Sequence, residues 1–478
     1  MVHSPPSLFA TLPLELITEI LSYCSNQCIE IHSDTSRTAL QSCQVLAGGE
    51  LVLLAQTCHW VRRVVRSTPT LWNTIIVDLR CFRDLPEEDL ISDPRSEYNW
   101  MLSLLNQVLG RGRNSPRRIE LYSPYGLHPR HFIQILTLWA AHWHNIRFSM
   151  NNDMLDLLQG VSFPSLKSLS LQLPYKRRAA RAHSAIRQPG YSLDFLSTQY
   201  APRLSFLSIF GALPSIDDLA PLLSTFVCSL RYADMPFILK IVPHLTSAAG
   251  LDLAVLSSFN HDVRKVLHSD GALFHRRVTS TLGKLSITQI SHHSTWDSDG
   301  NAVGVILDSL ALPELSSFRI SASRTPVVWP HVSGLAFLQR SGQSLTSLDL
   351  VTVCLSTAQL LAVLGAVPLL TSLYIRDNAD SDVPALVTDD LFVAVKLHQP
   401  ALVPALSGLS IGSRAAFTTS ALMQLLQHRQ EAQLVVVLYW LAGYGTASFQ
   451  EDVEKSLDEW DDQMQKREAQ GPDPGGHI

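Results

Sequence analysis

Apolar residues recur through most of the chain in a six-residue spacing, with a large apolar residue at the first, fourth and sixth positions. This alternation with polar residues is typical of a strand that buries one face. The clearest of these hexads occupy 166–171, 204–209, 282–287, 315–320, 345–350, 370–375 and 406–411. Weaker versions begin at Pro116, Trp143, Val227 and Ala248. Each hexad predicts a strand, and successive hexads begin about 21 to 38 residues apart, the range of irregular leucine-rich repeats.

Helical patterns lie between several of the predicted strands. They occupy 130–142, 216–227, 357–367 and 418–428. A helix after each strand buries the other side of the leucine layer, and stacked units of this kind form a solenoid. The predicted fold class is therefore α/β, with an irregular leucine-rich-repeat solenoid over 74–445. A large α/β domain with fortuitous spacing remains the alternative, because the asparagine that regular repeats carry after the strand is mostly absent.

The C-terminal pattern predicts an end to the repeats. Residues 434–440 are continuously apolar, so we expect a buried final strand. Beyond it, apolar residues recur at helical spacing, at Phe449, Val453, Leu457, Trp460 and Met464. We expect a capping helix over 446–469, because an open solenoid end needs cover, and a disordered tail over 470–478. A helix that detaches to bind a partner is the alternative.

The N-terminal pattern is mainly helical. Residues 11–24 predict an amphipathic helix, and a second helix, with apolar residues on two sides, ends before Pro69. Between them, residues 25–48 are polar and lack clear periodicity, so we expect a loop or a short irregular helix. Alternating apolar residues over 75–79 predict the first strand.

The residues of these N-terminal helices resemble a known module. The matching positions are Leu12-Pro13, Glu15, Ile20-Leu21, Leu54-Ala55, Cys58 and Ser67-Thr68-Pro69-x-Leu71-Trp72. In order and spacing they resemble the F-box, in the variant common in fungal F-box proteins, over residues 10–73. The resemblance implies a helical domain that docks onto the SKP adaptor subunit of a cullin-RING ubiquitin ligase. It also implies the adaptor-binding residues Leu12, Pro13, Leu16, Ile17, Ile20, Leu21, Leu54, Cys58 and Trp72.

The whole chain resembles F-box proteins with C-terminal leucine-rich repeats, in which the repeats hold a protein substrate. The resemblance implies a substrate-recognition subunit of an SCF-type E3 ubiquitin ligase, with an unidentified protein substrate, no cofactor and no enzymatic activity of its own. The alternative is a repeat scaffold for protein–protein interaction, whose F-box-like segment over 12–79 is only an end cap. Adaptor binding distinguishes the two, because only docking requires an exposed apolar face.

Strand residues between the buried leucines are the candidates for substrate binding, because they point to the concave face of a solenoid. The candidates are Ser168, Ser170, Gln172, Ser347 and Asp349. Lys176, Arg177 and Arg178 add a basic cluster, and arginine pairs well with doubly accepting anions. This cluster predicts either a site for an acidic segment, a phosphate or an import receptor, or a solvated loop.

Composition disfavours several other functions. The chain has 478 residues, 46% of them hydrophobic, and a formal net charge of -5, so bulk charge favours neither nucleic acid nor a membrane surface as a partner. The N-terminal residues lack the pattern of a secretory signal, and the longest apolar run, 434–442, is about half of a membrane span. We therefore expect an intracellular protein, cytoplasmic or nuclear.

Sequence patterns for chemistry are scarce. No P-loop, GxGxxG or HExxH pattern occurs, and we expect no nucleophile elbow. Seven cysteines are scattered without a CxxC pair, and the histidines at 142/144 and 292/293 lack the spacing of a helical metal pair. The sequence predicts binding rather than catalysis, with no catalytic residue and no metal ligand.

Overall fold

The computed structural model describes residues 29–33, 45–48, 59–82, 91, 97–112, 115, 117–123, 129–173, 191–211, 213–222, 227–231, 235–246, 250–256, 277–290, 302–322, 326–377, 385–397, 402–414, 416–428, 434–441 and 447–470. The chain divides into two compact units, 1–231 and 232–478, and each is described by itself. This division falls inside the predicted repeat region, and the domain boundaries given above stay predictions. None of the helices in these described ranges is long and apolar enough to cross a membrane.

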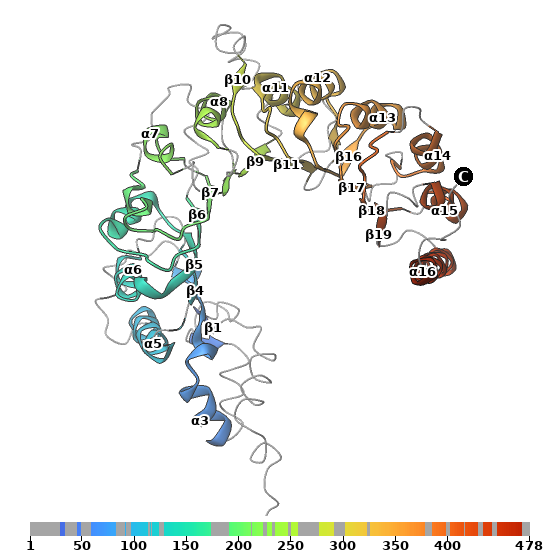
Figure 1. Ribbon diagram of the computed structural model, residues 1–478. Helices are drawn as coiled ribbons and strands as arrows, with labels where there is room; N and C mark the ends of the chain where they lie inside the picture. Colours follow the sequence, from blue (N-terminus) through green and yellow to red (C-terminus); the bar gives the residue numbers. More distant parts are fainter. Residues whose placement is uncertain are drawn as a thin grey trace, which may run out of the picture. The chain divides into compact units, whose positions relative to one another are not determined.

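A mainly parallel sheet forms the first unit, in the strand order β8-β7-β6-β5-β4-β3-β1-β2 (Figure 1). Its strands are β1 (Ile29–Ser33), β2 (Val45–Gly48), β3 (Thr74–Asp78), β4 (Arg117–Tyr122), β5 (Trp143–Ser149), β6 (Ser168–Gln172), β7 (Phe206–Phe210) and β8 (Val227–Arg231). Every neighbouring pair is parallel except β1 and β2. Because parallel neighbours need a crossover, the chain returns outside the sheet between successive strands.

Helices and 3-10 turns make these returns in the first unit. They are α3 (His59–Ser67), η2 (Pro69–Trp72), η3 (Arg80–Phe82), α5 (Glu97–Gly112), α6 (Arg130–Thr137), η4 (Ala140–His142), η5 (Asn152–Leu158), η7 (Asp194–Leu196) and α7 (Ile216–Leu219). Figure 1 shows α5, α6 and α7 on one side of the strands. Strand residues such as Leu169 and Leu171 are buried, as are helix residues such as Phe132 and Leu136, so the core lies between the two layers.

The second unit repeats this arrangement, with the strand order β19-β18-β17-β15-β13-β11-β9 and every described pair parallel. The strands are β9 (Gly250–Leu256), β11 (Lys284–Ile290), β13 (Ser317–Ala322), β15 (Ser347–Val351), β17 (Ser372–Arg376), β18 (Gly408–Ser413) and β19 (Val435–Trp440). Two short parallel pairs accompany this sheet: β10 (Val278–Thr279) with β12 (Leu310–Ala311), and β14 (Val327–Val328) with β16 (Val353–Cys354).

Helices lie on one side of the second sheet as well (Figure 1). They are α8 (Met235–Ile241), η8 (Val242–His244), α11 (Ala302–Ser309), α12 (His331–Ser341), η10 (Gly342–Ser344), α13 (Thr357–Gly365), α14 (Asp389–Leu397), α15 (Thr419–His428) and α16 (Ala447–Gln470). Ser356 and Gln359 form a reciprocal capping box at the start of α13, which satisfies two amide groups that the helix leaves free. The last helix, α16, packs Phe449 against Trp440 and Phe417.

The prediction of a mixed α/β fold is confirmed, and the structure adds that its strands form a large, mainly parallel sheet. Each predicted hexad overlaps a strand, and the segment 75–79 overlaps β3. The helical patterns at 130–142, 357–367 and 418–428 contain α6, α13 and α15, whereas 216–227 contains only the short α7. Leucine spacing therefore located the strands better than the helices between them.

The prediction of a loop or irregular helix over 25–48 is wrong for the residues that the structure describes there. This segment contains β1 and β2, which pair antiparallel, and β1 also pairs in parallel with β3. Alternation in β1 is short, Ile-Glu-Ile-His, and it is too brief to give a clear period. Pairing with a neighbouring strand therefore decides the conformation, because β propensity depends strongly on context.

The expected buried final strand is only half correct, because β19 is a strand but is not buried. Its residues alternate between exposed and half-buried, with Val435 63% exposed and Tyr439 53% exposed. Its position explains this, since β19 is the last strand in the described sheet and has one neighbour, β18. A continuous apolar run does not distinguish an edge strand from a central one.

A column of hydroxyl hydrogen bonds runs across the second sheet, with donors just before β13, β15, β17 and β18. Four hydroxyl side chains each donate to the main-chain carbonyl of the residue that directly precedes the neighbouring strand, at 2.9 to 3.3 Å; they belong to Ser316, Thr346, Thr371 and Ser407. Ser205 donates in the same way to Lys167 in the first unit. These hydroxyls link neighbouring strands at the end of the sheet where each of these strands begins.

Candidate functional site

The face of the first sheet turned away from the helices carries the predicted residues of β6. Leu169 and Leu171 are buried, while Ser168, Ser170 and Gln172 alternate with them and are half-buried. The register sets Ser170 beside Arg147 of β5 and Ser208 of β7. Adjacent strands lie about 4.8 Å apart, so these side chains share one continuous surface.

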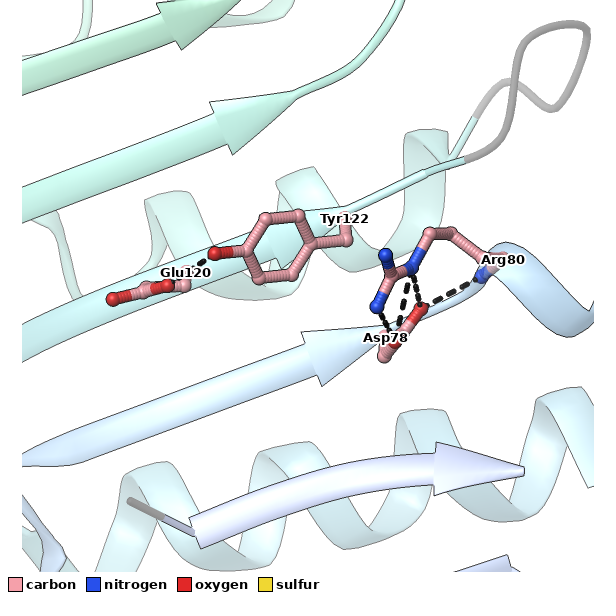
Figure 2. A network of polar contacts seen from close by, with 4 residues as sticks. All are labelled: Asp78, Arg80, Glu120 and Tyr122. Atoms are coloured by element: carbon pink, nitrogen blue, oxygen red, sulfur yellow. Dashed lines mark hydrogen bonds and ion pairs between the residues drawn. The ribbon is translucent and has the colours of Figure 1, made fainter. Parts of the chain in front are cut away.

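Beside this surface lies a polar cluster at the ends of β3 and β4 (Figure 2). Asp78 accepts hydrogen bonds from the Arg80 guanidinium, at 2.9 Å from Nε and 2.5 Å from Nη2. Glu120 accepts from the Tyr122 hydroxyl at 2.5 Å through one oxygen, and from Arg118 Nη2 at 2.7 Å through the other. Both carboxylates therefore have a partner on each oxygen.

The Tyr122 ring holds two arginine side chains. The guanidinium carbon of Arg80 lies 5.3 Å from the ring centre, and that of Arg147 lies 5.6 Å from it. Both distances are within the range of cation–π attraction. Tyr122 thus links the cluster on β3 and β4 to Arg147, which extends from the next strand and is exposed.

The charges of the cluster shift the pKa values of its acidic groups. Burial alone would raise the pKa of Glu120, but hydrogen bonds from Tyr122 and Arg118, together with the charges of Arg118 and Arg147, hold it below its usual value. Burial and the neighbouring Glu120 raise the pKa of the Tyr122 phenol. Glu120 is therefore a carboxylate at neutral pH, and Tyr122 keeps its proton.

Asp349 and Ser347, the other predicted residues, lie on β15 of the second unit. Both are half-buried on the face turned away from the helices, and Asp349 lies 3.6 Å from Arg319 Nη1 of β13. Burial raises the pKa of Asp349, and the charge of Arg319 opposes this rise. The structure therefore places Asp349 in an ion pair across two strands.

An aromatic and apolar patch on the same face was missed from the sequence. Val435, Val437 and Tyr439 of β19 are exposed, and the Tyr439 ring makes an edge contact with Tyr374 of β17 at 6.5 Å. Between them, β18 presents Gly408, Ser410 and Gly412. Every residue of 434–440 is apolar, so the sequence did not show which of them would be exposed.

Ser410 is also the centre of a Gly-x-Ser-x-Gly pattern, Gly408 to Gly412. In a hydrolase, that serine occupies a sharp turn between a strand and a helix. Here it lies in the middle of β18, in register with Tyr374 and Val437. The pattern is therefore part of a strand and forms no nucleophile elbow.

Of the predicted adaptor-binding residues, only Trp72 lies among the described residues. The other eight are outside them, as is the basic cluster of Lys176, Arg177 and Arg178. Trp72 is 3% exposed, its Nε1 donates to the Val65 carbonyl at 2.7 Å, and the Arg111 guanidinium lies 4.9 Å from its ring centre. Trp72 thus fixes the turn after α3 against α5, and an adaptor contact through this side chain stays a prediction.

Within the described ranges, no group of three histidine, cysteine, aspartate or glutamate side chains is placed to hold a metal ion. A small cavity of about 20 Å³ lies in the core of the second unit, among residues such as Leu373, Phe392 and Leu425. Its lining is wholly apolar and its volume is close to that of one water molecule. This lining offers no hydrogen-bonding group to a polar ligand.

Comparisons with known proteins add little to this picture. No family model matches the sequence, and no curated protein matches it. The structure is similar to a chain in the crystal structure of the Rad7 and Elc1 complex in yeast, with 15% sequence identity and a TM-score of 0.32, over 71% of this chain and 87% of that chain. At this TM-score the similarity carries no argument about fold or function.

Proposed function

We propose that this chain is a substrate-recognition subunit of an SCF-type ubiquitin ligase. In this proposal, residues 10–73 form an F-box that docks the SKP adaptor, and the strand-and-helix body is an irregular leucine-rich-repeat solenoid that holds a protein substrate. The chain then supplies binding and positioning, and the chemistry belongs to other subunits. The gain in rate comes from the high effective concentration of the substrate beside the ubiquitin-charged enzyme.

The observation that carries the proposal is the polar face of the two parallel sheets. Parallel sheets usually bury both faces, because crossovers cover each side. In both units the helices lie on one side, and the other face presents half-buried or exposed residues such as Ser170, Arg147 and Arg319. A broad, uncovered sheet face with arginine and tyrosine side chains suits a protein partner.

A second candidate is a repeat scaffold that never meets a ligase. The burial of Leu71 and Trp72 favours this scaffold function, because both side chains pack inside the first unit and neither is exposed for an adaptor to contact. In this alternative, residues 12–79 act as an end cap, and their apolar residues would be buried against the rest of the same chain. The two candidates differ only in whether an adaptor binds.

The test is co-purification of the full chain with its SKP adaptor. One variant carries Leu12→Asp, Pro13→Ala and Ile20→Asp in the predicted docking surface. A matched control carries Leu138→Asp and Val332→Asp, two helix-associated apolar residues that are 78% and 82% exposed. We expect the wild type and the control to retain the adaptor and the docking variant to lose it, with circular dichroism showing that all three are folded. If the folded wild type does not retain the adaptor, the scaffold function replaces the proposal.

A further inference from the structure

We propose that Arg147 is the centre of a surface that binds an anionic segment of the partner protein, either a carboxylate-rich or a phosphorylated peptide. This inference rests on the proposed function, because it names the kind of substrate that the uncovered sheet face would hold. It is carried by the distribution of charge around Tyr122.

Arg147 differs from the other arginines of the cluster in its partners. Arg80 is paired with both oxygens of Asp78, and Arg118 is paired with Glu120. Glu120 lies beside Arg147 in the register, but its oxygens are already bonded to Arg118 and Tyr122. Within the part of the chain that the structure describes, the Arg147 side chain contacts the Tyr122 ring and donates no hydrogen bond. Its guanidinium donors are therefore available to a ligand.

The residues on the other side of Arg147 are uncharged hydrogen-bonding groups. Ser170 and Ser208 continue the same row on β6 and β7, and Ser149 and Gln172 form the next row. All four are half-buried. These groups donate hydrogen bonds to an anion without adding a negative charge that would repel it.

The orientation of Arg147 is set by Tyr122, which is itself fixed by its hydrogen bond to Glu120. An arginine held against a ring has less conformational freedom to lose when it binds, so its hydrogen bonds cost less to form. Guanidinium groups pair with carboxylates and phosphates through two parallel hydrogen bonds. The surface therefore fits an acidic side chain on an extended segment that follows the strand face.

The experiment measures fluorescence polarisation of three labelled peptides with the full chain: octaglutamate, octaglutamine, and a peptide of alternating glycine and phosphoserine. We expect at least one anionic peptide to bind more tightly than octaglutamine, and the preferred one identifies the anion. Arg147→Gln is expected to weaken that binding about tenfold, the size of one charge-assisted hydrogen-bonding contact. The control Arg203→Gln removes the same charge from an exposed arginine of the first unit and is expected to change binding by about twofold or less.

Two results would overturn the inference. Either neither anionic peptide binds more tightly than octaglutamine, or the two arginine variants weaken binding equally, which would indicate bulk charge alone. Adaptor co-purification is measured on the same preparations, so the two failures are distinct. If the chain retains the adaptor but shows no preference for an anionic peptide, this inference is wrong and the ligase function stands. If the chain prefers an anionic peptide through Arg147 but does not bind the adaptor, the ligase function is wrong and this inference stands.

Discussion

The Thr371 hydroxyl donates a 3.0 Å hydrogen bond to the Thr346 carbonyl, one step of the hydroxyl column that crosses the second sheet. The same carbonyl also accepts from main-chain amides of the next strand. Replacing Thr371 by Val keeps the shape of the side chain and removes only the hydroxyl. We expect Thr371→Val to lower the free energy of unfolding by about 0.5–1 kcal/mol in chemical denaturation. Thr279→Val, at an exposed threonine outside the column, is the control, and an equal loss there would contradict a role for the column.

Replacing a glycine inside a helix by alanine usually stabilises the protein, but at Gly334 we expect the opposite. An added Cβ at this position of α12 would lie 2.4 Å from Cζ2 of Trp329, a side chain that is buried. We expect Gly334→Ala to lower the free energy of unfolding by about 1–3 kcal/mol. In α5, nothing lies within 4 Å of a Cβ added at Gly110. There the same substitution should raise stability by about 0.5–1 kcal/mol, as helix propensity requires. Stabilisation by both substitutions would contradict the packing of Trp329.

Asp377 organises the segment that follows β17. Its carboxylate accepts hydrogen bonds from the main-chain amides of Leu386 at 2.8 Å and of Val387 and Arg414 at 3.3 Å. In an Asn at this position, the side-chain NH2 group would replace one carboxylate oxygen and would face a main-chain N–H that now has an acceptor. We expect Asp377→Asn to lower the free energy of unfolding by about 1–3 kcal/mol. Asp390→Asn, at an exposed carboxylate of α14, should cost less than about 1 kcal/mol, and a similar loss for both would show that charge alone matters.

Glu120 predicts a pH dependence. Its folded pKa lies below the usual value of 4.5, so its stabilising effect is fully present above that value and is lost as the pH falls through the folded pKa. We expect the wild type to be more stable than Glu120→Gln near neutral pH, and the difference to narrow as the pH falls below 4.5. Urea denaturation across this range measures it. A difference that grows on acidification would contradict the predicted sign.

The leucine spacing was sufficient to place the strands because each hexad carries its own buried face. It missed β1 and β2, whose conformation depends on pairing with β3. It also missed the hydroxyl column, although a signal was present: Ser or Thr follows the first leucine of the hexads that begin at Leu204, Leu315, Leu345, Leu370 and Leu406.

The candidate site was predictable only in part. Alternation identified Ser170 and Gln172, because every second residue of a half-buried strand faces outward. Arg147 belongs to a weaker hexad and Tyr122 directly follows another, and the two come together through the register of neighbouring strands. A single sequence does not give that register, so the structure was needed to show which arginines of the cluster are paired with a carboxylate.

The most direct test of the proposed function is hydrogen–deuterium exchange of the full chain with and without its SKP adaptor. The proposal predicts slower exchange within residues 10–73 when the adaptor is present, and unchanged exchange in the strands from β4 to β18. Unchanged exchange over 10–73 at an adaptor concentration that would saturate a docking site would contradict it, as would protection confined to the repeat region.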